Sequence, residues 1–61
     1  KELIELLPPM QRDTIILKLY KNLKFKEIAK QTNCDINTAL ARFRLGIERL
    51  KKLADSDNFV L

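Results

Sequence analysis

Residues 23–36 read Leu-Lys-Phe-Lys-Glu-Ile-Ala-Lys-Gln-Thr-Asn-Cys-Asp-Ile. The apolar residues of this stretch recur at helical spacing, which predicts a short helix from about Phe25 to Thr32. Asn33 tolerates the left-handed backbone conformation that ends a helix, and Asp35 is a good N-cap for a second helix. The stretch therefore predicts two helices joined by a tight turn.

The second helix of this pair is expected to be long and one-sided. It should run from Ile36 to about Ala54, followed by a polar tail, residues 55–61, whose last three residues either fold back on the core or are a cut end. At about 100° per residue its apolar side chains form one stripe centred near Phe43. The stripe comprises Ile36, Ala39, Leu40, Phe43, Ile47, Leu50 and Ala54. The opposite face carries Asn37, Thr38, Ala41, Leu45, Glu48, Arg49 and Lys52, with Arg42 and Arg44 on its flanks.

Two more helices are expected before this pair. Residues 3–7 carry a short apolar helical face that stops at Pro8-Pro9, because proline disfavours helix before it but fits a helix's first turn. The next helix should run to about Lys21, with Asn22 as a left-handed C-cap. Its apolar residues at helical spacing are Ile15, Ile16, Leu19 and Tyr20. The predicted fold class is all-α, a small three- to four-helix bundle containing a helix-turn-helix.

The composition limits what the chain can do. With 61 residues it forms one domain, and a chain this short buries only about 60% of its unfolded surface. One cysteine cannot form an internal disulfide, so the chain fits a reducing compartment. It has no histidine, and its carboxylates are scattered, so we expect neither an enzyme nor a metal or cofactor site. No apolar run approaches the ~20 residues that span a bilayer, so membrane insertion is not expected.

The helix-turn-helix and the charge together favour nucleic acid. Ala29 is the small residue where the two helices would cross, and a larger side chain there would push them apart. In this motif the second helix presents its N-terminal turns to the major groove while the first crosses the backbone. The net charge of +4 suits DNA, although a solvated lysine-rich surface would give the same composition. A plain helical bundle is the alternative to DNA binding at this point.

A family resemblance appears when the motifs are taken in order. Leu7-Pro8, Gln11-Arg12, Leu23, Phe25 to Ala29, Thr38, Arg42-Phe43 and Leu50 together resemble region 4 of bacterial sigma factors, above all the extracytoplasmic-function group. The resemblance covers about residues 3–53, so residues 1–54 are taken as the domain. It implies recognition of the −35 promoter element and docking on the flap of the RNA polymerase β subunit in the bacterial cytoplasm. It also implies masking by an anti-sigma factor. Because the chain begins at Lys1 on an apolar helical pattern, we expect it to be part of a longer protein.

The resemblance also places candidate DNA-binding residues. The recognition-helix segment holds Asn37, Thr38, Leu40, Ala41, Arg42, Arg44 and Leu45, and positions near the DNA backbone hold Arg12, Lys24 and Lys26. Arg49 joins this set, although we favour a solvated or long-range electrostatic role over specific contacts for it, Lys51 and Lys52. Leu40, Ala41 and Leu45 stand where many family members have polar or basic groups. Leu45 would touch a thymine methyl group or, alternatively, meet another protein helix.

Several residues have a structural interpretation as well as a functional one. Arg42 either contacts DNA or pairs with Glu27 across the helix crossing, and Thr38 either donates to a phosphate or is solvated. Cys34 is interpreted as a core filler rather than a redox sensor. Lys24 is a weak helix cap, because lysine offers no side-chain acceptor.

Two other functions stay open. The output domain of a two-component-type transcription regulator carries a similar helix and usually dimerises. A helical protein-interaction module would use a Leu40/Leu45 surface. The Leu7-Pro8 start and the long final helix favour the sigma interpretation.

Overall fold

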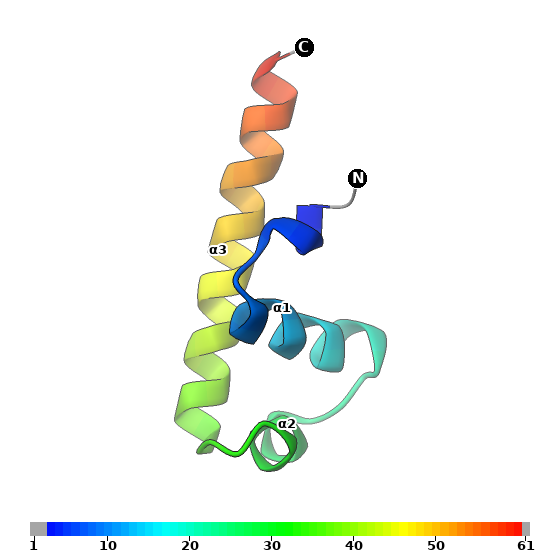
Figure 1. Ribbon diagram of the computed structural model, residues 1–61, viewed down its shortest axis with the longest axis vertical. Helices are drawn as coiled ribbons and strands as arrows, with labels where there is room; N and C mark the ends of the chain where they lie inside the picture. Colours follow the sequence, from blue (N-terminus) through cyan, green and yellow to red (C-terminus); the bar gives the residue numbers. More distant parts are fainter. Residues whose placement is uncertain (1–2, 61) are drawn as a thin grey trace.

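The computed structural model describes the backbone of residues 3–60 and the side chains of residues 3–55. The elements are η1 (Leu3–Leu6), α1 (Pro9–Ile15), η2 (Ile16–Tyr20), α2 (Phe25–Gln31) and α3 (Ile36–Val60). Within this part of the chain the fold is all-α without a strand, which confirms the predicted class. Figure 1 shows α3 as a long rod, with η1, α1 and α2 placed at three successive levels along it.

The two short helices meet α3 where its residues are small. Ala39 is fully buried together with Ile28 and Ala29 of α2, which confirms Ala29 as the crossing residue. At Gly46 an added Cβ would lie 2.5 Å from the Cδ1 atom of Ile15 in α1. Ala39 and Gly46 lie about two helical turns apart and so on one face of α3. That face is therefore the one on which the molecule is assembled.

An aromatic contact joins α2 to α3 beside this cluster. The rings of Phe25 and Phe43 meet edge to face, with centroids 5.4 Å apart. The Lys18 ammonium lies 4.6 Å from the centroid of the Phe25 ring, a cation–π contact that links η2 to α2. Cys34 is partly buried and packs against the same cluster, and its Sγ lies 3.3 Å from the hydroxyl of Thr32, which agrees with the position of a core filler.

The turns follow the local signals. Asn22 and Asn33 have φ values of 59° and 58°, so both adopt the predicted left-handed conformation. After Asn33, the backbone N–H of Cys34 donates to the Ala29 carbonyl at 2.9 Å and closes the end of α2. The chain therefore leaves α2 and enters α3 through one tight, hydrogen-bonded turn.

The second predicted helix differs from expectation after Ile15. Ile15 is buried, but Leu19 and Tyr20 are 56% and 67% exposed, so their place on the apolar face is wrong. The reason is that α1 continues as the π-helix η2, in which the N–H of Lys21 donates to the carbonyl five residues earlier. This wider turn rotates the later side chains away from the core.

Thr14 occupies a core position that the apolar pattern missed. It is 1% exposed, and its hydroxyl donates to the Met10 carbonyl at 2.9 Å. A buried hydroxyl is tolerated when it is hydrogen-bonded, and a threonine in a helix finds this acceptor in the preceding turn.

The long helix departs from prediction in two ways. It continues to Val60 instead of ending near Ala54, because residues 55–58 contain neither glycine nor proline and each costs only about 0.5 kcal/mol in a helix. The expected packing of residues 59–61 on the core stays a prediction, because their side chains lie outside those that the structure describes. The buried face of α3 is centred on Ala39 and Gly46. Around the helix axis this direction lies about 50° from Phe43, the predicted centre of the apolar stripe. Ile36, at the edge of the stripe, is therefore 45% exposed.

The contact at Gly46 predicts an unusual response to alanine. Gly46→Ala gains about 1 kcal/mol of helix propensity, but overpacking a filled core costs about 1–3 kcal/mol. We expect net destabilisation of up to about 2 kcal/mol in urea denaturation. In an Ile15→Val background, which lacks Cδ1, the same substitution should become neutral or stabilising. Equal effects in both backgrounds would show that Ile15 does not fill this space.

Candidate nucleic-acid interface

The candidate interface begins where α3 begins. An Asp35 carboxylate oxygen, Oδ1, accepts a hydrogen bond from the Thr38 backbone N–H at 2.7 Å, which confirms Asp35 as the N-cap. This bond favours the charged carboxylate and therefore lowers the pKa of Asp35 below its usual value. The cap fixes the first turn of a long helix whose positive end is suited to a phosphate.

The outward face of α3 has a mixed character. Between residues 37 and 48, at about 100° per residue, five exposed residues lie within about 70° of the direction opposite to Ala39 and Gly46. They are Asn37, Ala41, Arg44, Leu45 and Glu48. Leu45 is 52% exposed. One cation, one carboxylate, one amide and two apolar groups therefore face away from the core in this first part of α3, and Lys51, Lys52 and Asp55 continue the face toward its end.

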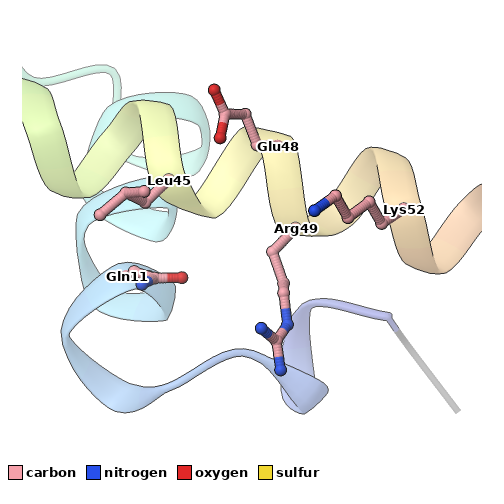
Figure 2. A pocket seen from close by; sticks show the side chains of 5 residues that line it. All are labelled: Gln11, Leu45, Glu48, Arg49 and Lys52. Carbon is pink, nitrogen blue, oxygen red and sulfur yellow. The ribbon is translucent and has the colours of Figure 1, made fainter.

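A groove lies between α1 and the middle of α3. It is lined by Gln11, Leu45, Glu48, Arg49 and Lys52. In Figure 2, Gln11 lies beside Leu45, and Arg49 reaches toward the segment that joins η1 to α1. Glu48 points to the other side of α3. The groove thus has the apolar Leu45 and the Gln11 amide at one end, and the cations of Arg49 and Lys52 from the next turns of α3 at the other.

The basic residues predicted near the DNA backbone lie on the other helices. Lys24 and Lys26 are exposed at the start of α2. The Lys24 backbone N–H donates to the Glu27 carboxylate at 2.9 Å, so the glutamate stabilises this helix start although the lysine cannot. Arg12 in α1 is half-buried, and its Nε lies 3.8 Å from an oxygen of Asp13. A pair of this exposure contributes little and leaves the guanidinium available.

The structure separates two residues that the sequence interpretation had joined. Leu40 is half-buried and lies about 140° around α3 from Leu45, because the two are five residues apart. The Leu40/Leu45 surface proposed for a protein-interaction module is therefore wrong. Thr38 is half-buried and contributes its backbone N–H to the cap.

Arg42 does not have the predicted partner. No Arg42–Glu27 ion pair lies within 4.0 Å, so the bracing pair is wrong, since Glu27 accepts from the start of its own helix. Arg42 is half-buried, and its Nη1 atom is buried without a hydrogen-bond partner among the described residues. The packing of α3 against its neighbours holds this guanidinium partly inside, which no local pattern indicated.

The groove contains residues that the sequence interpretation did not select as site residues. Gln11 appeared only as part of a motif, and Glu48 and Lys52 only as members of the polar face. The signal that would have found Gln11 is Gly46, since a Cβ there would lie 3.5 Å from the Cβ of Gln11. A glycine inside a long helix marks the place where another element comes close.

Two other kinds of site are absent from the described part of the chain. Residues 3–55 contain no group of three or more histidine, cysteine, aspartate or glutamate side chains placed to hold a metal ion. Of the helices between residues 3 and 60, none has the length and apolar character needed to cross a membrane.

The fold and the outward face of α3 define a helix-turn-helix domain of the DNA-binding type. The family described as Sigma-70, region 4 matches residues 1–50. The chain therefore belongs to this family, which consists of DNA-binding domains of sigma factors and is not a known enzyme family. Comparison with curated proteins and with solved structures gave no match. The narrower placement in the extracytoplasmic-function group stays a prediction.

The Asp35 cap predicts a pH-dependent helix start. Because its pKa is lowered by folding, its stabilising effect is fully present above the unfolded value, about 3.9. The effect is lost as pH falls through the lower folded value. Asp35→Asn keeps a capping side chain that does not titrate. We expect the melting temperature of the original chain to fall toward, or below, that of the variant between pH 5 and pH 2.

Thermal unfolding followed by circular dichroism over this pH range measures the effect. Glu48→Gln is the matched control, because it removes an exposed carboxylate that caps no helix. A gap between the original chain and Asp35→Asn that stays constant with pH would contradict the assignment.

Proposed function

We propose that this domain recognises the −35 promoter element in the major groove through the first turns of α3. It would act in transcription initiation as part of a sigma factor held on RNA polymerase in the bacterial cytoplasm. The observation that carries the proposal is the exposed polar and basic face of α3, which starts at a capped turn and lies opposite the packed face. Membership of the sigma region 4 family supports the same conclusion.

The dimensions support insertion of the start of α3. From Asp35 to Leu45 the helix rises about 15 Å, and the major groove is about 12 Å wide and 8.5 Å deep. The first turns can therefore lie against base edges, while Arg49 and Lys52 come near the phosphates that border the groove. Lys24 and Lys26 lie at the start of α2, the helix that crosses the backbone in this motif. We keep Arg12 and Arg42 as candidate DNA contacts.

A different side of α3 suits the polymerase. Because burial is centred away from the apolar stripe, Ile36 is 45% exposed and Leu40 and Ile47 are only half-buried. A shallow groove beside them is lined by Phe43, Arg44, Ile47, Glu48 and Lys51. We assign Leu40 to this apolar flank instead of the DNA-reading face. An uncovered apolar flank is typical of a protein interface, and we propose that the β flap covers it, with an anti-sigma factor as competitor.

Arg44 provides the test of DNA recognition. A site selected from random duplexes should bind the chain weakly, with log K falling by about 0.9 per phosphate contact for each unit of log salt. Arg44→Ala should weaken binding by about fivefold to 150-fold if the guanidinium contacts a base edge, worth about 1–3 kcal/mol. Arg44→Lys separates the two modes: it keeps a phosphate contact but loses a bidentate base contact. Fluorescence anisotropy at several salt concentrations measures both.

Lys21→Ala is the matched control, since it removes an exposed cation that caps η2, and Figure 1 shows the end of η2 on the side away from α3. Affinity that does not depend on salt would contradict the electrostatic part. Selected sites with two-fold symmetry would favour the two-component-type regulator. If Arg44→Ala and Thr38→Ala leave DNA affinity unchanged while Leu45→Asp abolishes a protein complex, the domain is a protein-interaction module.

A further inference from the structure

The DNA-reading face of α3 carries a ridge with two apolar members. Asn37, Ala41 and Leu45 follow one another at intervals of four residues, and all three are exposed. Leu45 keeps half of its surface in water, where a polar side chain would be better solvated. The helix therefore presents a small and a large apolar group in line on the side that the proposed function directs at base edges.

Only one apolar group is available on the edges of base pairs in the major groove. This is the C5 methyl group of thymine, since the other groups are hydrogen-bond donors and acceptors. A leucine set against donors and acceptors would leave them without partners, which costs free energy, whereas a methyl group buries apolar surface on both sides. Leu45 is thus suited to thymine and unsuited to the other three bases.

The backbone at Leu45 is fixed by the packing of the next residue. The side chain lies beside Gln11 of α1 at the wall of the groove, and Gly46, the next residue, is held against Ile15. The backbone that carries Leu45 therefore loses little further freedom on binding, which favours discrimination. Arg49, one turn later, points toward the segment between η1 and α1 and can meet a phosphate beyond the last base contacted.

The spacing along the ridge sets the spacing of the bases. Ala41 and Leu45 are about 6 Å apart along the helix axis, which corresponds to about two base-pair steps of 3.4 Å. Ala41 has a side chain short enough to bring the backbone close to the bases. Asn37 lies about 6 Å further toward the helix start, and its amide matches the donor and acceptor of adenine.

We propose that Leu45 is a specificity-determining residue that reads a thymine C5 methyl group, with Ala41 admitting close approach to the neighbouring bases. The inference rests on the proposed function, because it names the base chemistry that this face of α3 selects. It requires that the preferred duplex contain a thymine whose methyl group, not its hydrogen-bonding edge, is recognised.

Single replacements of thymine by deoxyuridine test this directly, because they remove the methyl group and keep base pairing and charge. Each thymine of the selected duplex is replaced in turn, and binding to the chain is measured by fluorescence anisotropy at one salt concentration. We expect one position at which deoxyuridine lowers affinity by about three- to fivefold, the factor expected for one buried methyl group. With Leu45→Ala this preference for thymine should disappear.

Leu19→Ala is the matched control, because it makes the same substitution at an equally exposed leucine that lies in η2 and not on the ridge. It should keep the preference for thymine. A selected duplex in which no deoxyuridine replacement matters would overturn the inference while leaving promoter recognition intact. A thymine preference that survives in Leu45→Ala would also overturn it. If the chain selects no duplex sequence at all, the proposed function fails together with it.

Discussion

The close approach of α1 to α3 at Gly46 is the contact on which the rest of the structure depends. The δ-methyl group of Ile15 occupies the space that a side chain at position 46 would fill. Two turns earlier, Ala39 gives α2 the same freedom to approach. A domain of 61 residues has little buried surface in reserve. Two small residues on one face of one helix therefore decide how the other elements are placed, and also which face of α3 is left for a partner.

The direction of α3 is fixed separately, at its start. Asn33 turns the chain in the left-handed conformation, and the Asp35 carboxylate then receives the Thr38 N–H. Neither interaction buries much surface, but both restrict the backbone between two helices that are already packed at Ala29 and Ala39. Packing holds the helices together and capping sets the residue at which the exposed face begins. A DNA-reading helix needs both, because a rotation of one residue, about 100°, would present a different set of side chains.

The helix starts, the turns and the fold class could be predicted from the sequence because their causes are local. Proline at 8 and 9, asparagine at 22 and 33 and aspartate at 35 act through their own backbone preferences. The packed face of α3 could not be predicted in the same way. Apolar side chains placed its centre near Phe43, but helices approach where side chains are small, and this moved the centre toward Ala39 and Gly46. The π-helix and the partly buried Arg42 also depend on tertiary packing. The site residues were placed by family resemblance, and only their exposure and neighbours come from the fold.

The rotation of the packed face leaves α3 with two kinds of exposed surface. Had burial been centred on Phe43, the whole apolar stripe would be covered, and a protein partner would have only the polar face to bind. As the molecule stands, Ile36, Leu40 and Ile47 remain partly open on one flank, and Leu45 lies on another. Leu45 lies about 140° or more around α3 from these three residues. Arg44 and Glu48 lie between the two surfaces and also line the groove beside the flank. The apolar flank is a separate surface and does not account for Leu45. We therefore attribute the exposure of this leucine on the outer face to what α3 meets in the DNA major groove.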